Sequence, residues 1–306
     1  MGFIRVYPHK DYRKMLSRQK TLVTMLRYAG GSASRVQLTK WAFLLATETP
    51  SHGNSGYYQF VPYLYGPHSF SLYREMNLLV RDGIVEPPEG NSGWKLTDTG
   101  LRTPLVVEPS VRTGVRYVMS RYGSMSGRQL MEMVYEQHPW FTINSEDGDQ
   151  HHERRPIAEA AIYTLGYEGL SVDGFLNQLL YDGMKCVLDV RSNPVSRRFG
   201  FHKSTLAHLC NLIGIEYRHF PELGIPASDR SNLVTKDDYA KLFANYRSTV
   251  LPVQDGVLRQ VASIAMSCPT VLLCMEANPA YCHRSSLAQA VAPLANLPVV
   301  HLEWPR

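Results

Sequence analysis

The residues best suited to chemistry lie close together near the end of the chain. Two thiols, a carboxylate, an imidazole and a guanidinium fall within eleven residues: Cys274, Glu276, Cys282, His283 and Arg284. This set offers a nucleophile, an acid or base, and a fork that binds anions. Packing alone seldom requires all of these groups in so short a stretch, so we predict that it belongs to a functional site.

The local pattern predicts which elements carry this stretch. The apolar run 270–273 is typical of a buried strand, Asn278-Pro279 breaks the chain, and the alanine-rich run 281–292 predicts a helix. Cys274 and Glu276 then leave the carboxyl end of a strand, while Cys282 opens a helix. Ligands of open α/β sheets bind at that edge, and the start of a helix attracts anions.

Strands alternate with helices through the whole second half of the chain. We predict strands at 161–166, 185–191, 215–220, 270–273 and 297–302, with helices at 171–180, 204–212, 237–246, 256–266 and 281–292. This alternation predicts an α/β domain with a three-layer, largely parallel, Rossmann-like sheet. The ends of the other strands bring further polar residues to the same edge: Tyr167, Glu168, Asp189, Arg191 and Glu222.

Two carboxylates follow predicted central strands and could face one cleft. Enzymes that cleave glycosidic bonds use such a pair, one charged and one acting as an acid. For this chemistry we assign Asp189 to stabilising a sugar cation or aligning water, and Glu276 to the role of acid or base. Arg191 is the third predicted catalytic residue. A salt bridge between Asp189 and Arg191, or a cap on the following loop, is the competing interpretation.

Other residues at this edge are candidates for holding a substrate. Tyr167 could stack on an extruded base, and Arg284 could bind a phosphate or sugar hydroxyls through its guanidinium fork. Core packing and structural ion pairs are the competing interpretations. The predicted substrate-binding set is Tyr167, Glu168, Glu222, Cys274, Cys282, His283 and Arg284.

The cysteines allow two further interpretations. A thiol at a helix start beside an arginine would have its thiolate favoured, so Cys282 could be a nucleophile. Cys274, Cys282 and His283 could also bind zinc, although Cys-x7-Cys-His fits no standard finger and a fourth ligand would have to come from elsewhere. We predict neither a metal nor a cofactor.

The first half of the chain, residues 1–145, predicts a different domain. Helical periodicity is found at 18–28, from Ser32 or Ser34 through residue 45, and at 69–82, and a short hairpin turns near Gly90. Three helices followed by a hairpin are typical of a winged helix, so we predict a mainly helical, winged-helix-like domain that binds nucleic acid. A polar linker over 146–158 joins it to the α/β domain at 159–306.

The distribution of charge favours a DNA partner. Residues 1–155 hold 19 Lys+Arg against 14 Asp+Glu, whereas residues 156–306 hold 13 of each. Basic side chains contact the phosphates of duplex DNA, and ordinary surface charge is the competing interpretation. The predicted contacts to double-stranded DNA are Arg35, Lys40, Arg197, Arg198, His202 and Lys203.

Apolar runs and cysteines also indicate the cellular location of the chain. No apolar run approaches the roughly 20 residues of a membrane span, and the first residues lack the apolar core of a secretory signal. We therefore predict no membrane partner and a cytoplasmic location. The five cysteines, an odd number, are expected to be reduced thiols.

Motifs in both halves resemble known families. The second domain resembles the "domain of unknown function four-eight-eight" family through four motifs in order: TLGYEG at 164–169, DVRSNP at 189–194, PELG at 221–224, and Cys274-x-Glu276-x5-Cys282-His283-Arg284. FVPYLYGPHS at 60–69, with VYE at 134–136 and HPW at 138–140, is similar to winged-helix domains of antitoxin- and phage-associated proteins.

The combination of a winged helix with this α/β domain resembles the Brig-type anti-phage DNA glycosylases. That resemblance implies hydrolysis of the N-glycosidic bond of a modified base, a glucosylated hydroxymethylcytosine in phage DNA, to leave an abasic site. Two alternatives stay open. The chain could be a cysteine-thiolate enzyme acting on a modified base or nucleotide, or a non-enzymatic regulator that senses a nucleotide.

Overall fold

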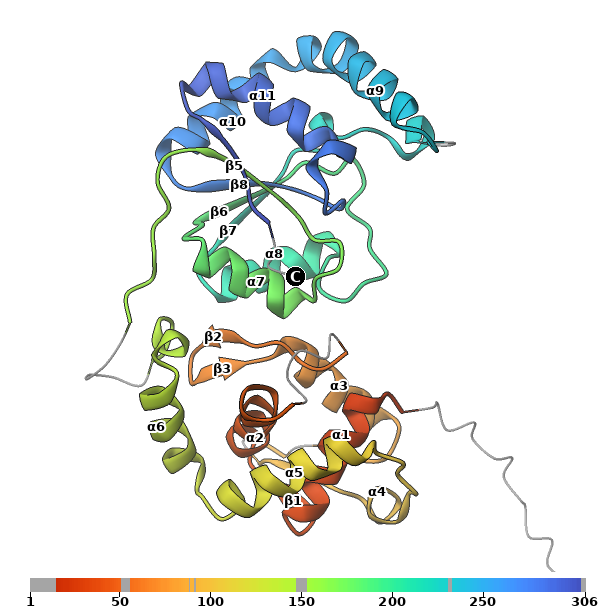
Figure 1. Ribbon diagram of the computed structural model, residues 1–306, viewed down its shortest axis with the longest axis vertical. Coiled ribbons are helices and arrows are strands. Elements are labelled where there is room, and N and C mark those ends of the chain that lie inside the picture. Colours follow the sequence, from red (N-terminus) through yellow and green to blue (C-terminus); the bar gives the residue numbers. More distant parts are fainter. Residues whose placement is uncertain are drawn as a thin grey trace, which may run out of the picture. The chain divides into compact units, whose positions relative to one another are not determined.

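The chain forms two compact units. The computed structural model describes residues 15–50, 56–87, 89–90, 92–146, 153–230 and 233–303 (Figure 1). One unit comprises Met1–Phe60 and Tyr65–Pro139, and the other comprises Val61–Leu64 and Trp140–Arg306. The domain boundary at 145 and the linker over 146–158 stay predictions, because residues 147–152 lie outside the described part of the chain.

The first unit is mainly helical. Its elements are α1 (Ser17–Tyr28), β1 (Ser32–Ala33), α2 (Arg35–Glu48), β3 (Gly66–His68), α3 (Phe70–Arg81), β4 (Trp94–Lys95), α4 (Asp98–Arg102), α5 (Pro109–Tyr122) and α6 (Gly127–Gln137). Helix α2 begins after Ser34, whose hydroxyl accepts the backbone N–H of Gln37 at 3.1 Å. The Gln37 side chain accepts the backbone N–H of Ser34 in return, which completes a capping box.

A small antiparallel sheet accompanies these helices. Strand β1 pairs with β4, and Val85 forms a bridge with Leu96. The aromatic run at 57–63 is mostly irregular, since only β2 (Val61–Tyr63) is a strand. Within the first unit Tyr58 is buried and donates its hydroxyl proton to Glu75 at 2.7 Å. The aromatic side chain of Tyr58 therefore serves packing.

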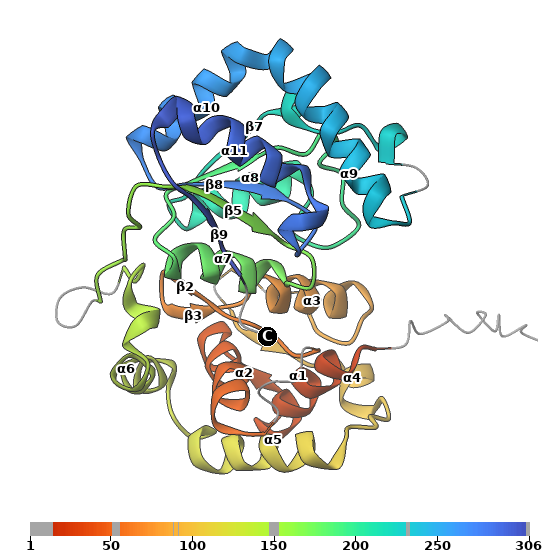
Figure 2. The same cartoon turned by 45° about the horizontal axis from the view of Figure 1, so that its top comes forward.

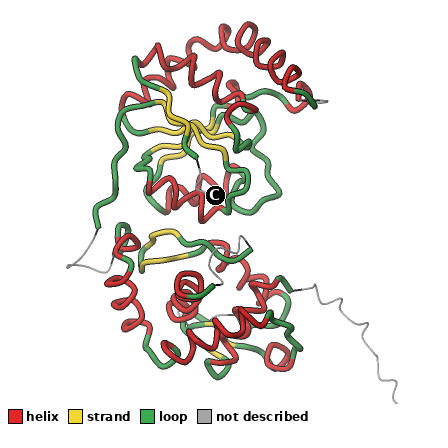
Figure 3. Tube along the Cα trace, viewed as in Figure 1, coloured by secondary structure: helices red, strands yellow, loops and turns green. Residues whose placement is uncertain are grey.

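The second unit contains a parallel five-stranded sheet, as predicted (Figure 3). Its strands are β5 (Ile162–Gly166), β6 (Cys186–Asp189), β7 (Glu216–His219), β8 (Thr270–Cys274) and β9 (Val299–His301). They lie in the order β7-β6-β8-β5-β9, and every neighbouring pair is parallel. The sequence predicted no strand order, and the observed order differs from that of the Rossmann fold because β8 separates β5 from β6. Fully buried β5, β6 and β8 occupy the centre, while partly exposed β7 lies at an edge.

Helices cover both faces of this sheet. Figure 1 shows α7 (Val172–Tyr181) and α8 (Lys203–Leu212) on one face, with α10 (Asp255–Ser267) and α11 (His283–Ala295) on the other. The connections from β5 through β7 advance along the sheet in one direction, and those from β7 through β9 return. Right-handed crossovers that run in opposite directions place their helices on opposite faces, which gives the three layers.

Strands β5 and β8 are neighbours in the sheet, but the connections that follow them run in opposite directions along it. The connection from β5 leads to α7 and the connection from β8 leads to α11, on opposite faces of the sheet (Figure 2). Such a switch point is where open α/β sheets bind ligands. Helix α9 (Lys236–Asn245) lies between β7 and α10 in the sequence. Among the described residues, none of the helices has both the length and the hydropathy that crossing a membrane requires.

Glycine at the end of β5 allows the loop after β8 to approach closely. A Cβ atom on Gly166 would lie 1.8 Å from the carbonyl oxygen of Glu276 and 2.5 Å from its carbonyl carbon. Real Cβ atoms do not come so near to backbone, so a side chain at Gly166 requires the loop to move.

Gly166→Ala is expected to lower the free energy of unfolding by about 1–3 kcal/mol, because the added methyl group overpacks the loop. Gly256→Ala is the control, since its Cβ would meet nothing within 4 Å. That change is expected to be neutral or to stabilise by up to ~1 kcal/mol. Urea unfolding curves give both values, and equal stability of Gly166→Ala and the wild type would contradict the close approach.

Candidate functional site

A buried arginine holds the loop that follows β8. Arg284, in the first turn of α11, is fully buried, and its guanidinium donates to the backbone carbonyls of Glu276 and Ala277. Its Nε donates to Thr164 Oγ1 on β5 at 3.4 Å. From the other side, the carboxylate of Glu168 accepts the backbone N–H of Ala277 at 2.9 Å. The backbone of this loop is therefore fixed by groups on β5, after β5 and on α11.

The position of Arg284 corrects its predicted role. We expected its guanidinium to bind a phosphate or a sugar. In the structure the side chain has no exposed surface, and its donors already meet protein oxygens. Arg284 therefore positions the loop that carries Glu276 and does not meet a ligand itself.

Glu276 lines a cavity of about 200 Å³ at the carboxyl edge of the sheet. Its side chain keeps 22% of its surface exposed, and its Oε1 lies 3.4 Å from Nη1 of Arg230. The described lining of this cavity comes from the segments after β7 and β8 and from α9. Its other polar and aromatic walls are Arg230, Tyr239, Phe243, Tyr281, Cys282 and His283.

The carboxyl group of Glu276 is kept charged by its neighbours. Burial by itself would raise its pKa. The Cys274 thiol, whose Sγ lies 3.0 Å from Oε2, its own backbone N–H, the Cys282 thiol and the charge of Arg230 together lower the pKa below its ordinary value. A charged carboxylate in a small cavity can stabilise a cation or orient a water molecule.

Arg230, Tyr239, Phe243 and Tyr281 line the cavity but were not predicted from the sequence. Tyr239 and Phe243 lie four residues apart on α9, all ten residues of which are exposed or half-buried within the described chain. The rings of Tyr239 and Tyr281 meet edge to face at 5.1 Å. An aromatic pair at this spacing on a polar helix was the available signal. No comparable pattern surrounds Arg230, which ends the turn Ala227–Arg230.

Cys274, Cys282 and His283 form a buried cluster behind Glu276. Their side chains are 1%, 2% and 2% exposed, and their ligand atoms all lie within 4.8 Å of one another. Burial and the neighbouring Cys274 thiol raise the pKa of Cys282 well above its ordinary value, although His283 opposes the shift. The start of α11 therefore does not favour a thiolate, and the nucleophilic interpretation of Cys282 loses support.

Asp189 and Arg191 form a buried ion pair. The Asp189 carboxylate accepts from Nε of Arg191 at 2.8 Å, from its Nη2 at 2.5 Å, and from the hydroxyl of Tyr217 at 2.5 Å. Burial opposes the charge of Arg191, but hydrogen bonds and the charge of Asp189 raise its pKa. Their predicted catalytic roles are corrected, because Asp189 is fully buried and both groups are satisfied by protein partners.

Tyr167 is part of the same packed network. Its ring stacks on Phe201 with centroids 4.1 Å apart, and the guanidinium of Arg191 lies 5.1 Å from its centroid. Its hydroxyl accepts from Arg191 Nη1 at 3.1 Å. Since the ring is 5% exposed, Tyr167 does not offer a face to an extruded base, which corrects that prediction.

A comparison with family models finds a match within the second unit. Residues 171–291 match the family described as "Domain of unknown function DUF488". The match confirms the predicted family for these residues, which include Asp189, Glu276 and Cys282. No curated protein and no solved structure matches the chain.

Several predicted contact residues are exposed. Arg197, Arg198, His202 and Lys203 are exposed at the loop between β6 and α8 and at the start of that helix. Glu222 is exposed in the turn Pro221–Leu223 after β7. The two segments follow the carboxyl ends of β6 and β7, so these side chains lie on the side of the sheet where the sequence predicted a binding edge.

Lys40 does not reach a DNA phosphate. It is 2% exposed in α2, and its ammonium donates to the backbone carbonyls of Tyr65 and, at 3.2 Å, Pro67. Burial lowers its pKa to about 7. The predicted DNA contact is corrected, because Lys40 lies on the buried side of α2. Arg35, at the start of α2, is half-buried.

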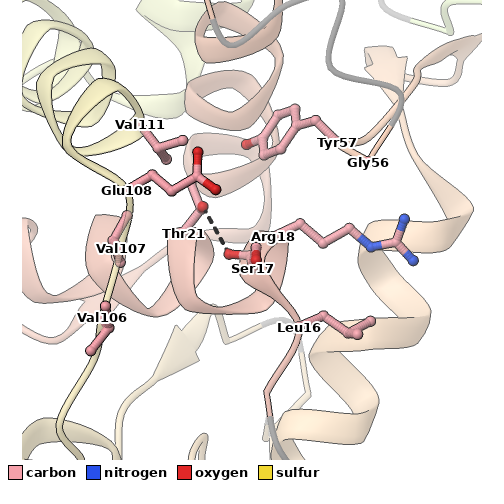
Figure 4. A pocket seen from close by; sticks show the side chains of 10 residues that line it. All are labelled: Leu16, Ser17, Arg18, Thr21, Gly56, Tyr57, Val106, Val107, Glu108 and Val111. Carbon is pink, nitrogen blue, oxygen red and sulfur yellow. Dashed lines mark hydrogen bonds between the residues drawn. The ribbon is translucent and has the colours of Figure 1, made fainter.

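The first unit also contains a cavity of about 450 Å³ (Figure 4). Figure 4 shows Tyr57, Glu108 and Thr21 around it, and the Thr21 hydroxyl donates to the Ser17 carbonyl at 3.1 Å. Burial raises the pKa of Tyr57. The only charged side chains in the lining are Glu108 and Arg18, so this described cavity does not favour a phosphate backbone.

Asp189→Asn is expected to lower the free energy of unfolding by about 3–5 kcal/mol, because it leaves the buried charge of Arg191 without its partner. The matched control is Asp255→Asn, which breaks an exposed aspartate–arginine pair with Arg259. That pair is expected to contribute less than about 1 kcal/mol. Urea unfolding measures both variants, and similar losses would contradict the structural role of Asp189.

Proposed function

We propose that the chain is a DNA glycosylase that hydrolyses the N-glycosidic bond of a modified base. The observation that carries the proposal is the charged Glu276 carboxylate in a cavity with aromatic walls, formed by the segments after β7 and β8 and by α9. A volume of about 200 Å³ is below the roughly 300–1,000 Å³ of pockets for drug-sized ligands. It suits one planar ring, such as a base extruded from a duplex.

The proposed reaction passes through an oxocarbenium-like sugar. As the bond between C1′ and the base nitrogen breaks, Glu276 stabilises the positive charge and orients the attacking water. The water oxygen bonds to C1′, and the departing base gains the proton that balances the reaction. Arg230 keeps the carboxylate charged and oriented, while Tyr239 and Tyr281 pack against the base. Glu276 thus takes the role first assigned to Asp189.

The proposed substrate is a modified cytosine, and glucosylated hydroxymethylcytosine is the finer hypothesis. It rests on the resemblance to Brig-type glycosylases. A second cavity of about 1060 Å³ shares the loop after β8 and is lined by residues that include Glu168, Asn278 and Glu303. Carboxylates and amides accept hydrogen bonds from hydroxyl groups, so this cavity suits a sugar attached to the base.

The first unit is proposed to bind the duplex. The order α1, β1, α2, α3 and β4, with its β1–β4 pairing and the Val85–Leu96 bridge, is typical of a winged helix. On α3 the exposed residues Arg74, Asn77 and Arg81 recur at three- and four-residue steps and share one face. A helix with such a face can enter the major groove.

Alkali-labile sites test the proposed reaction. Phage DNA with glucosylated hydroxymethylcytosine is expected to break under mild alkali after incubation with the protein, and unmodified DNA is not. Glu276→Gln should slow the reaction by about 10²–10⁴-fold, the range for a group that acts on a proton or charge in the transition state. Glu216→Gln, an exposed carboxylate at the amino end of β7, is the control. No abasic sites on any modified DNA, or wild-type activity in Glu276→Gln, would contradict the proposal.

DNA affinity tests the role of α3. Arg74→Ala and Arg81→Ala are each expected to weaken duplex binding and to reduce the slope of log K against log salt by about 1, as loss of one phosphate contact does. Fluorescence anisotropy at several salt concentrations gives the slope. Arg128→Ala on α6, whose side chain is 85% exposed, is the control. Unchanged slopes in both α3 variants would show that another surface binds DNA.

A further inference from the structure

We propose that Cys274, Cys282 and His283 form a zinc site that opens onto the cavity lined by Glu276. Two thiols and an imidazole are ligands that zinc takes in proteins. Binding of Zn²⁺ displaces the protons of both thiols, and the two thiolates then neutralise the charge of the ion, so that the buried cluster carries no net charge with a neutral histidine. The site is argued from its own geometry and does not require the proposed glycosylase reaction.

The distances between the three side chains suit a tetrahedral ion. Bonds of about 2.3 Å to sulfur and 2.0–2.1 Å to nitrogen separate tetrahedral ligand atoms by roughly 3.5–3.8 Å. In the structure Cys274 Sγ lies 3.8 Å from Nδ1 of His283, and all three ligand atoms lie within 4.8 Å of one another. Small rotations of the side chains bring them to bonding positions.

The backbone sets the protonation of the histidine for this role. Nε2 of His283 lies 3.1 Å from the carbonyl oxygen of Val190, so Nε2 carries the proton and Nδ1 presents its lone pair to the thiols. Histidines that bind metals usually donate their other ring N–H to a carbonyl or carboxylate in this way. The backbone N–H of Val190 donates in turn to Leu273 at 3.2 Å, which ties the histidine to β8.

The fourth position of the ion faces the cavity. Cys282, His283 and Glu276 line that cavity, which provides a path for the ion and for water. Catalytic zinc sites hold three protein ligands and a water in the fourth position. Without the ion, Glu276 Oε2 accepts from the Cys274 thiol at 3.0 Å. Once zinc displaces that proton, Oε2 is available to accept a hydrogen bond from the water. A glutamate beside a His/Cys/Cys zinc site activates water in the same manner in base deaminases.

The metal content of the purified protein tests the site. After incubation with excess zinc and dialysis, elemental analysis is expected to find one zinc per chain. Cys274→Ser and Cys282→Ser should lose the ion. Cys186→Ser and Cys210→Ser, which change buried cysteines outside the cluster, should keep it. Glu276→Gln should also keep it, since this side chain is not a ligand.

Cobalt gives a readout that does not depend on the variants folding alike. Wild-type protein loaded with Co²⁺ is expected to show thiolate-to-cobalt charge-transfer bands and visible bands of a tetrahedral ion, which a chelator removes and added cobalt restores. Absence of zinc and of these bands, or an unchanged spectrum in Cys282→Ser, would overturn the proposal. So would a Cys274–Cys282 disulfide in freshly prepared protein. Zinc binding without abasic sites would retain the metal site and refute the glycosylase.

Discussion

The buried guanidinium of Arg284 is the interaction on which the candidate site depends. A buried charge is tolerated only when its hydrogen bonds are satisfied, and here the carbonyls of Glu276 and Ala277 provide them. The same bonds fix the loop after β8. Gly166 leaves room for that loop beside β5. The direction in which the Glu276 side chain enters the cavity follows from these two constraints, one attractive and one steric.

The two buried arginines stabilise different parts of the carboxyl edge of the sheet: Arg284 binds the loop after β8, and Arg191 binds residues at the ends of β5 and β6. Arg191 joins Asp189 on β6 to Tyr167 after β5, and Asp189 also holds Tyr217 on β7. This network links three of the strands and leaves Asp189 without a free oxygen toward a ligand. Arg284 fixes the backbone of Glu276, and the Glu276 carboxylate lines a cavity. The acid that ties the strands together is thus distinct from the acid that lines the cavity.

Sequence patterns predicted the helices and strands better than they predicted which strands lie side by side in the sheet. The patterns identified the five parallel strands, but burial does not specify which strand lies next to which, so the position of β8 between β5 and β6 was not predicted. The expectation that residues after the carboxyl ends of parallel strands meet was confirmed for Cys274, Glu276 and His283. It could not separate a guanidinium that binds ligands from one that binds carbonyls, as with Arg284. It also could not find Arg230, which ends the short turn Ala227–Arg230 and does not follow a strand directly.

We have proposed that Glu276 acts on a glycosidic bond within this cavity. Mass spectrometry of the small molecules released from modified phage DNA tests it most directly. We expect release of the intact modified base, in an amount equal to that of the abasic sites formed, and a loss of both in Glu276→Gln. Release of a deaminated or otherwise altered base, or an altered base that stays joined to the DNA, would contradict the account.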